Sequence, residues 1–309
     1  MRSSARCAVA VALAAPMVAV PVATAHAEPA VSAKAGPSGV YAKSALLLDV
    51  GAKKVRWSRS PHTKRRIGSI TKVMTAYVVI KSGNLDRKIT VQRKHVDYLR
   101  GNGAGGSSAG LVVGDRLTVR QLLRALMLPS GCDAAYVLAD AYGPGWKGFV
   151  AKMNKTARGL KMTNTKYANF DGIDWKGATM YSTAYDQTRL AAAAMKLKEF
   201  RSVVGTRSYR VPPTSTTHIY NWTNTNALLG KYKGMTGVKT GFTNMAGASF
   251  MFGAKRGGRE LVGIVLNSGS GSYKSRRFTD ASKILNWGFG VRSADLPVMS
   301  RSLDDGRFD

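Results

Sequence analysis

Strand-like patterns stand at both ends of this 309-residue chain, and helix-like patterns fill its middle. Residues 41–50 predict a strand and residues 55–58 its hairpin partner. Helical periodicity is found between about residues 85 and 200, and two more strands and a closing helix follow. The central helices are expected at 118–128, 133–142, 146–160 and 184–197. The two later strands are expected at 250–254 and 261–266, and the closing helix at 275–287. The order predicts an α/β fold, with an antiparallel sheet built from both chain ends, flanked by helices, and a mostly helical subdomain.

The first 27 residues have the pattern of a secretory signal peptide. Two arginines precede an apolar stretch at residues 7–22, and residues 25–27 read Ala-His-Ala, a small-x-small cleavage site. A membrane anchor is the weaker interpretation, because Pro16 and Pro21 interrupt a short apolar run. We therefore expect a secreted protein.

The rest of the chain divides by composition. Residues 28–38 are rich in Ala, Pro, Ser and Gly and predict a flexible leader, residues 39–290 predict the globular domain, and residues 291–309 form a polar tail. Removal of residues 1–27 would leave Cys132 as the single cysteine, which excludes a disulfide within the mature chain.

The charge balance is strongly basic. The chain has 47 lysine and arginine residues against 17 aspartate and glutamate residues, a net charge of +30 that becomes +28 without the signal peptide. Such a protein is attracted to polyanions. A secreted protein meets anionic cell-wall polymers first, so we expect it to associate with the cell wall. No nucleic-acid-binding motif is present, and we expect no nucleic-acid partner.

Ser69 and Lys72 form the first of three motifs that carry chemistry. They are three residues apart at the predicted start of a helix that would end near Gly83, so they would share one face. A serine hydroxyl needs a base to take its proton. A lysine can do this only where burial or a neighbouring cation favours its neutral form, and Lys239 would supply such a cation.

The other two motifs are Ser130-Gly131-Cys132 and Lys239-Thr240-Gly241. Each motif alone is weak, because a Ser-x-x-Lys occurs by chance about once in a chain of this size. Their order, spacing and predicted local structure together indicate an acyl-transfer site with a serine nucleophile and a lysine base.

Longer segments around these motifs resemble one family, the serine D-alanyl-D-alanine carboxypeptidases and transpeptidases, or low-molecular-weight penicillin-binding proteins. The segments are RIGSITKVMTA at 66–76, LTVRQLL at 117–123, LMLPSG at 126–131, YSTA at 181–184 and GVKTGFT at 237–243. The resemblance covers about residues 39–290 and implies the fold that this family shares with serine β-lactamases, with the three motifs gathered in one cleft.

The resemblance also implies a mechanism. Ser69 would attack the penultimate D-alanine of a peptidoglycan stem peptide while Lys72 takes its proton. The backbone N–H groups of Ser69 and Phe242, the residue after Gly241, would hold the oxyanion. Ser130 would pass the proton to the departing D-alanine, whose carboxylate would bind Lys239 and Thr240. β-Lactam antibiotics, which resemble that peptide end, would acylate Ser69.

Cys132 departs from the commoner family pattern, which has asparagine at this position. We expect it to contact the substrate as a partly accessible thiol that tunes the site. A role as the nucleophile is disfavoured, because no histidine stands in a recognised Cys–His context. No metal-ligand spacing is present and no cofactor is expected.

Two alternatives remain open from sequence. A serine β-lactamase would share the fold and motifs, but no glutamate is recognised at the position of its water-activating carboxylate. A non-catalytic, basic wall-binding protein is disfavoured by the intact Ser69, Lys72 and Lys239.

Overall fold

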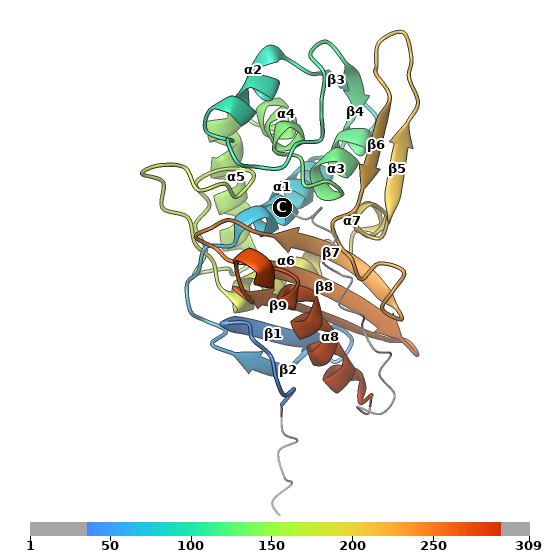
Figure 1. Cartoon of the computed structure of the whole chain (residues 1–309). Helices are drawn as coiled ribbons and strands as arrows, with labels where there is room; N and C mark the ends of the chain where they lie inside the picture. Colours follow the sequence, from blue (N-terminus) through green and yellow to red (C-terminus); the bar gives the residue numbers. More distant parts are fainter. Residues whose placement is uncertain (1–35, 292–309) are drawn as a thin grey trace, which may run out of the picture. The chain divides into compact units, whose positions relative to one another are not determined.

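A five-stranded antiparallel sheet joins the two ends of the chain that the structure describes (Figure 1). The structure is a computed structural model and describes residues 36–291, so the expected signal peptide and nearly all of the leader and tail lie outside this range. The strand order is β2 (Lys54–Arg59), β1 (Ser44–Asp49), β9 (Arg259–Leu266), β8 (Ser249–Arg256) and β7 (Met235–Gly241). Because β1 pairs with both β2 and β9, the prediction of a sheet built from both chain ends is confirmed.

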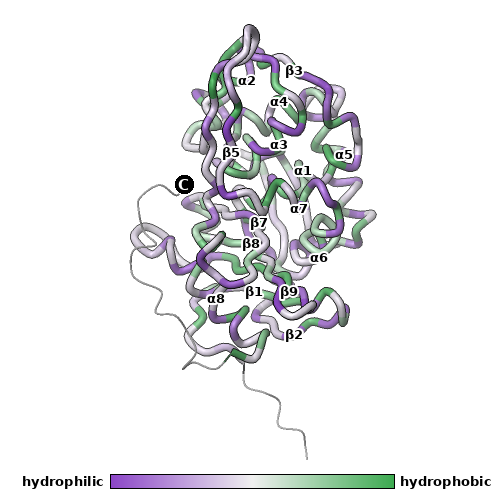
Figure 2. Tube along the Cα trace, turned by 90° about the vertical axis from the view of Figure 1, so that its right-hand side faces the viewer, coloured by the Kyte–Doolittle hydropathy of each residue, from purple (hydrophilic) through white to green (hydrophobic). Residues whose placement is uncertain are grey.

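Both faces of this sheet are covered. Helix α8 (Arg276–Phe289) packs on β8 and β9, and α6 (Ala184–Ala194) packs on β1 and β9 from the other side. Successive strand residues point to opposite faces. Accordingly Leu46 belongs to the core shared with the helices, whereas Leu47 belongs to the core beneath α8. Figure 2 shows hydrophobic residues recurring along both the sheet and the helices.

The helical part of the chain lies at one side of the sheet (Figure 1). Its elements are α1 (Thr71–Ser82), β3 (Lys88–Thr90), α2 (Arg93–Asp97), β4 (Arg116–Thr118), α3 (Val119–Met127), α4 (Cys132–Tyr142) and α5 (Gly145–Gly159). Helix α3 begins with a capping box, in which Thr118 Oγ1 accepts from the backbone N–H of Gln121 and the Gln121 side chain accepts from that of Thr118. The observed helix bounds agree with those predicted from periodicity to within a few residues.

Residues 160–183, between α5 and α6, contain no helix, which agrees with the expected helix bounds of 146–160 and 184–197 to within one residue. A further helix, α7 (Lys198–Val204), and a hairpin of β5 (Ser208–Val211) and β6 (Tyr220–Thr223) were not anticipated. Between residues 36 and 291, the structure contains no helix that is both long and apolar enough to cross a membrane.

Candidate active site

Ser69 lies in a 3₁₀ turn, Gly68–Ile70, that leads directly into α1. The sequence predicted Ser69 as the first residue of an α-helix; the α-helix instead begins at Thr71, because its first turn is wound more tightly, as is frequent at helix ends. The expected C-cap is confirmed at Gly83, which has φ of 75°. Ser69 and Lys72 remain one turn apart, and Lys72 Nζ lies 2.8 Å from Ser69 Oγ.

Lys72 is fully buried and its amine has three partners. Besides Ser69, Nζ lies 3.0 Å from the carbonyl oxygen of Asp171 and 3.4 Å from Cys132 Sγ. These contacts match the three directions in which a lysine amine can hydrogen-bond. The amine is therefore held in place against the nucleophile and is separated from bulk water.

Two glycines allow three chain segments to meet beside Ser69. Gly68 has φ of +52°, and a Cβ there would lie 3.2 Å from backbone atoms of Phe242. Gly172 has φ of +94°, and a Cβ there would lie 1.9 Å from the carbonyl oxygen of Gly68. A side chain at either position would push the segments apart. The backbone of Phe242 is thus in contact with the turn that carries the nucleophile, as an oxyanion hole shared by Ser69 and Phe242 requires.

The third motif lies on β7, which is an edge strand of the sheet. Lys239 and Thr240 are buried, and the Thr240 hydroxyl lies 2.6 Å from the hydroxyl of Thr225. Lys239 Nζ donates to the carbonyl oxygen of Thr240 at 3.0 Å. A Cβ at Gly241 would lie 3.0 Å from the carbonyl oxygen of Ile67, so β7 also contacts the segment before Ser69.

Ser130 and Cys132 occupy the turn before α4 and its first residue, respectively. Among the described residues the Ser130 hydroxyl is buried and has no hydrogen-bond partner, so the structure shows no hydrogen bond through which Ser130 would relay a proton. Cys132 is also fully buried. The expectation of a partly accessible thiol is wrong, because Gly106 packs on it: a Cβ at Gly106 would lie 2.6 Å from Cys132 Sγ.

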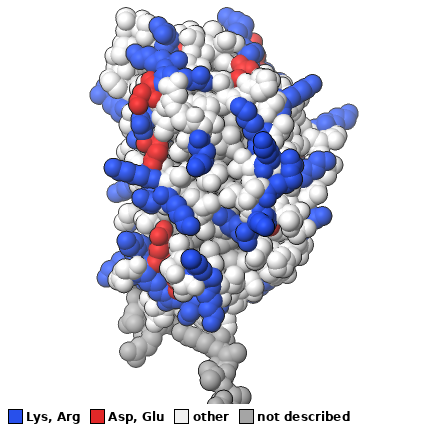
Figure 3. All heavy atoms as spheres, turned by 180° about the vertical axis from the view of Figure 1, so that it is seen from behind, with Lys and Arg blue, Asp and Glu red and all other residues white. Residues whose placement is uncertain are grey.

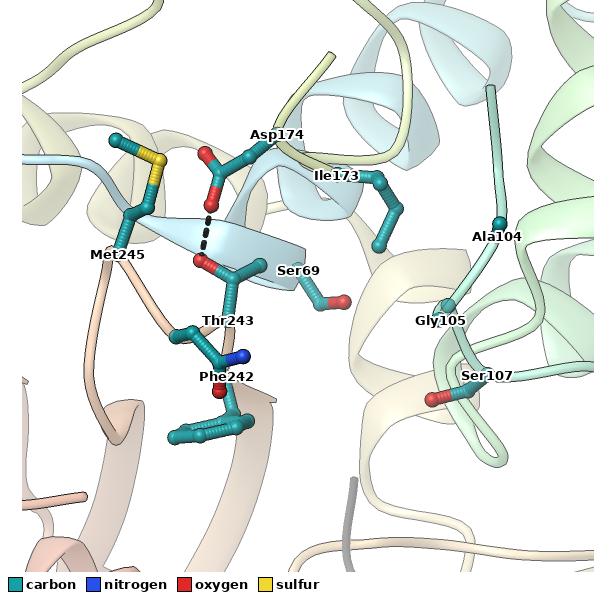
Figure 4. Close-up of a pocket in the computed structure, with 11 residues that line it drawn as sticks. Ser69, Ala104, Gly105, Ser107, Ile173, Asp174, Phe242, Thr243 and Met245 are labelled. Carbon is teal, nitrogen blue, oxygen red and sulfur yellow. Dashed lines mark hydrogen bonds between the residues drawn. The ribbon is translucent and has the colours of Figure 1, made fainter. Parts of the chain in front are cut away.

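A cavity of about 300 Å³ opens above Ser69 (Figure 4). Ser69 and Phe242 line it together with residues of three loops: Ala104, Gly105, Gly106, Ser107, Ile173, Asp174, Thr243, Asn244 and Met245. The other predicted site residues lie behind this lining: Lys72, Ser130, Cys132, Lys239, Thr240 and Gly241. In this structure Cys132 contacts Lys72 and does not line the cavity, and its contact with a substrate stays a prediction.

Asp174 joins two of the loops that line the cavity and was missed by sequence reasoning. Its Oδ2 accepts from Thr243 Oγ1 at 2.6 Å, the bond drawn dashed in Figure 4, and its Oδ1 accepts from Arg66 at 2.8 Å. Thr243 directly follows Phe242, and Arg66 lies three residues before Ser69. Asp174 consequently connects the segment before Ser69 with the loop after Phe242.

Asp171 is a second carboxylate that the sequence did not single out. Its Oδ2 accepts from the Tyr98 hydroxyl at 2.7 Å, its Oδ1 accepts from the backbone N–H of Ile173 at 3.1 Å, and its carbonyl oxygen contacts Lys72. Burial, together with this carboxylate, raises the pKa of Tyr98, so the phenol stays a proton donor. The turn pattern at residues 169–172, Asn-Phe-Asp-Gly, was the available signal for a structured loop here.

Burial likewise raises the pKa of the Cys132 thiol, although the neighbouring Lys72 opposes that effect. A thiol attacks as its thiolate. The neutral, covered sulfur is therefore unsuited to act as the nucleophile.

Comparisons with known proteins agree with the family resemblance found in the sequence. The D-alanyl-D-alanine carboxypeptidase family matches residues 30–270. A D-alanyl-D-alanine carboxypeptidase of Streptomyces sp. strain K15 is 43% identical over 264 residues, which are 82% of this chain and 88% of that protein. D-alanyl-D-alanine carboxypeptidase DacF of Bacillus subtilis is 31% identical over 80% of this chain, which spans 62% of that longer relative.

Solved structures agree with the sequence matches. The crystal structure of the Streptomyces K15 DD-transpeptidase has 44% sequence identity and a TM-score of 0.77, covering 83% of this chain and 99% of that one. A D-alanyl-D-alanine carboxypeptidase from Mycobacterium tuberculosis has 29% identity and a TM-score of 0.74, covering 84% and 97%.

The mixed sheet-and-helix fold has a serine that lines its cavity and a buried lysine one turn away. This combination defines the class of serine enzymes that comprises penicillin-binding proteins and serine β-lactamases. Within that class, the chain belongs to the D-alanyl-D-alanine carboxypeptidase family.

Proposed function

We propose that this protein is a serine acyl-enzyme peptidase that acts on the D-alanyl-D-alanine end of peptidoglycan stem peptides. It would release the terminal D-alanine as a carboxypeptidase, transfer the shortened peptide to an amine as a transpeptidase, or do both. The observation that carries the proposal is the 2.8 Å contact between the buried Lys72 amine and the Ser69 hydroxyl at the base of the cavity.

The proposed reaction begins when Ser69 attacks the carbonyl of the penultimate D-alanine and Lys72 takes the serine proton. The N–H groups of Ser69 and Phe242 would stabilise the developing oxyanion. The buried Ser130 hydroxyl, which lacks a partner among the described residues, would gain one in the departing amine. It would pass its proton to that amine and receive in exchange the proton that Lys72 took from Ser69. Lys239 and Thr240 would hold the carboxylate of that D-alanine, after which water or an amine attacks the acyl-enzyme.

The carboxylates of Asp171 and Asp174 favour a D-alanyl-D-alanine peptidase over a β-lactamase. In the common, class A serine β-lactamases, a glutamate carboxylate activates the water that removes the acyl group. Both oxygens of Asp174 accept hydrogen bonds, from Arg66 and Thr243, and both oxygens of Asp171 accept from Tyr98 and Ile173. We therefore expect a long-lived penicilloyl-enzyme.

Incubation with a fluorescent penicillin tests the proposal. A stable label that maps to Ser69 by mass spectrometry is the expected result. A label that disappears within seconds would identify a β-lactamase instead, and no label on the folded protein would leave a non-catalytic wall-binding protein.

We further propose that the enzyme is secreted and held at the cell wall by its charge. Support comes from the signal-like first 27 residues and the net charge of +28 that remains without them. Lys and Arg side chains are spread over the face shown in Figure 3, with few acidic ones between them.

Attraction between exposed charges is screened over about 10 Å at 0.1 M salt. The protein should consequently leave isolated cell walls as salt concentration rises, without detergent, as measured by sedimentation. Release that requires detergent would contradict this attachment.

A further inference from the structure

Tyr98 is connected by hydrogen bonds, through one intervening residue, to the lysine proposed as the general base. It is 9% exposed and begins the 3₁₀ turn Tyr98–Arg100, which follows α2. The phenol donates to the buried carboxylate of Asp171, and the indole N–H of Trp175 donates to the phenol oxygen at 3.1 Å. The backbone carbonyl oxygen of the same Asp171 accepts from Lys72 Nζ. The phenol is therefore one residue away from the amine of Lys72.

The carbonyl oxygen of Asp171 determines which way that amine faces. A neutral lysine amine has two N–H groups and one lone pair, and it acts as a base through the lone pair. Its three partners are the Ser69 hydroxyl at 2.8 Å, the Asp171 carbonyl oxygen at 3.0 Å and Cys132 Sγ at 3.4 Å. A carbonyl oxygen only accepts, so it takes one N–H group. When the second N–H group points to the sulfur, the lone pair is left facing the serine proton.

The peptide group that carries this carbonyl is held from several sides. One carboxylate oxygen of Asp171 accepts from Tyr98 at 2.7 Å, and the other accepts from the N–H of Ile173 at 3.1 Å. The N–H of the same peptide group, which belongs to Gly172, donates to Asn169 Oδ1 at 2.8 Å. Of these partners the phenol is distant in sequence, whereas the others lie within the turn at residues 169–173. Tyr98 therefore anchors the turn to the helical part of the chain.

The surroundings of the phenol leave its proton for Asp171. Its oxygen already accepts from Trp175, and burial together with the Asp171 carboxylate raises the pKa of Tyr98. The ring packs against those of Tyr136 and Phe170, with centres 5.2 and 5.4 Å away. A phenylalanine at this position would keep the ring contacts and lose only the hydroxyl, so the two contributions can be separated.

We propose that Tyr98 is a positioning residue for the base Lys72, which it holds through Asp171. Its hydroxyl keeps the Asp171 carbonyl oxygen in place, so that the amine directs its lone pair at Ser69. Tyr98 lies outside the cavity lining given above and keeps its own proton while the serine proton passes to the lysine. This inference rests on the proposed function, because it takes Lys72 as the general base.

Tyr98→Phe tests the hydroxyl. Acylation by a chromogenic β-lactam over a range of concentrations separates the dissociation constant of the first complex from the acylation rate constant. The rate constant should fall about tenfold, the effect of losing a hydrogen bond to a charged group, while the dissociation constant stays within about twofold. Tyr142→Phe is the matched control. It removes an equally buried phenol that donates to the carbonyl oxygen of Gly83, at the far end of α1, and it should change neither constant.

Asp171→Asn tests whether Tyr98 acts through Asp171. The amide offers an oxygen to only one of the two donors, Tyr98 and Ile173, so the acylation rate constant should again fall about tenfold. Adding Tyr98→Phe to this variant should slow acylation by no more than about a further twofold, whereas independent effects would multiply to about a hundredfold.

A folded Tyr98→Phe protein with the original acylation rate constant would overturn the inference, even if its dissociation constant rises, because the phenol would then shape only the rim of the cavity. Equal slowing by Tyr142→Phe, or effects that multiply in the double variant, would overturn it as well. Penicillin would still label Ser69 in each of these cases, so the proposed function is judged separately by that label.

Discussion

The base of the catalytic cavity and its rim are built in different ways. At the base, Ser69, Lys72 and Cys132 are at most 4% exposed and lie on α1, α4 and the turn before α1. At the rim, three loops meet, and Met245 is 61% exposed. The base is positioned by the packing of helices, whereas the rim is positioned by a few side-chain bonds such as that between Asp174 and Thr243. Loss of a reacting group at the base should therefore abolish or strongly slow acylation, whereas changes at the rim should slow it less.

Ser69→Ala should have the largest effect. With the nucleophile gone, penicillin labelling and D-alanine release should both fall below detection, while the thermal unfolding temperature stays close to that of the original protein. Ser82→Ala, at the other end of α1, is the control and should label normally. Labelling that persists in a folded Ser69→Ala protein would assign the nucleophile to another residue.

Lys72→Ala should slow acylation by a factor of about 10² or more, the usual scale for loss of a general base. The rate is measured by stopped-flow with a chromogenic β-lactam. Lys81→Ala, which removes an exposed lysine from the same helix, should leave the rate unchanged. A rate near the original for the Lys72 variant would mean that a different group accepts the serine proton.

Thr243→Val tests the rim. It removes the hydroxyl that Asp174 binds while keeping the side-chain shape, and the loss of a hydrogen bond to a charged group should slow acylation about tenfold. Thr243→Ser retains the hydroxyl and should restore most of the rate. A valine variant that reacts as fast as the original protein would show that the hydrogen bond between Asp174 and Thr243 does not position Phe242. The proposed role of side-chain bonds at the rim would then be wrong.

Cys132→Ala should have the smallest effect, although the residue lies at the base. Lys72 keeps its contacts with Ser69 and Asp171 when the sulfur is removed, so the acylation rate should change only several-fold. Mass spectrometry of the labelled peptide should still identify Ser69. An inactive but folded variant, or label on Cys132 in the original protein, would refute the assignment of Ser69 as the sole nucleophile.

The same division explains what the sequence could predict. Ser69 and Lys72 are neighbours within one helical turn, so spacing alone placed them together. Strand-like segments next to glycine-containing turns likewise predicted β1 and β9. The bridge from Asp174 to Thr243 joins residues 69 positions apart, and that from Arg66 to Asp174 joins residues 108 apart. Local patterns contain no information about such pairs. The burial of Cys132 was mispredicted for a related reason, because it depends on where the glycine-rich loop at residues 101–110 packs.

The pairing of β1 with β9 also determines when the sheet can be completed while the chain is being synthesised. Leu46 and Leu47 are buried only when β9 lies beside them and α8 covers the sheet, yet Ser44 and its partner Leu266 are separated by most of the chain. Closing so long a loop is entropically costly, and folds with many distant contacts form slowly. Until residues 259–289 have been made, the strand at the start of the domain has an open, apolar edge that can pair with other chains. Completion of the C-terminal segment is thus the step that ends this exposure.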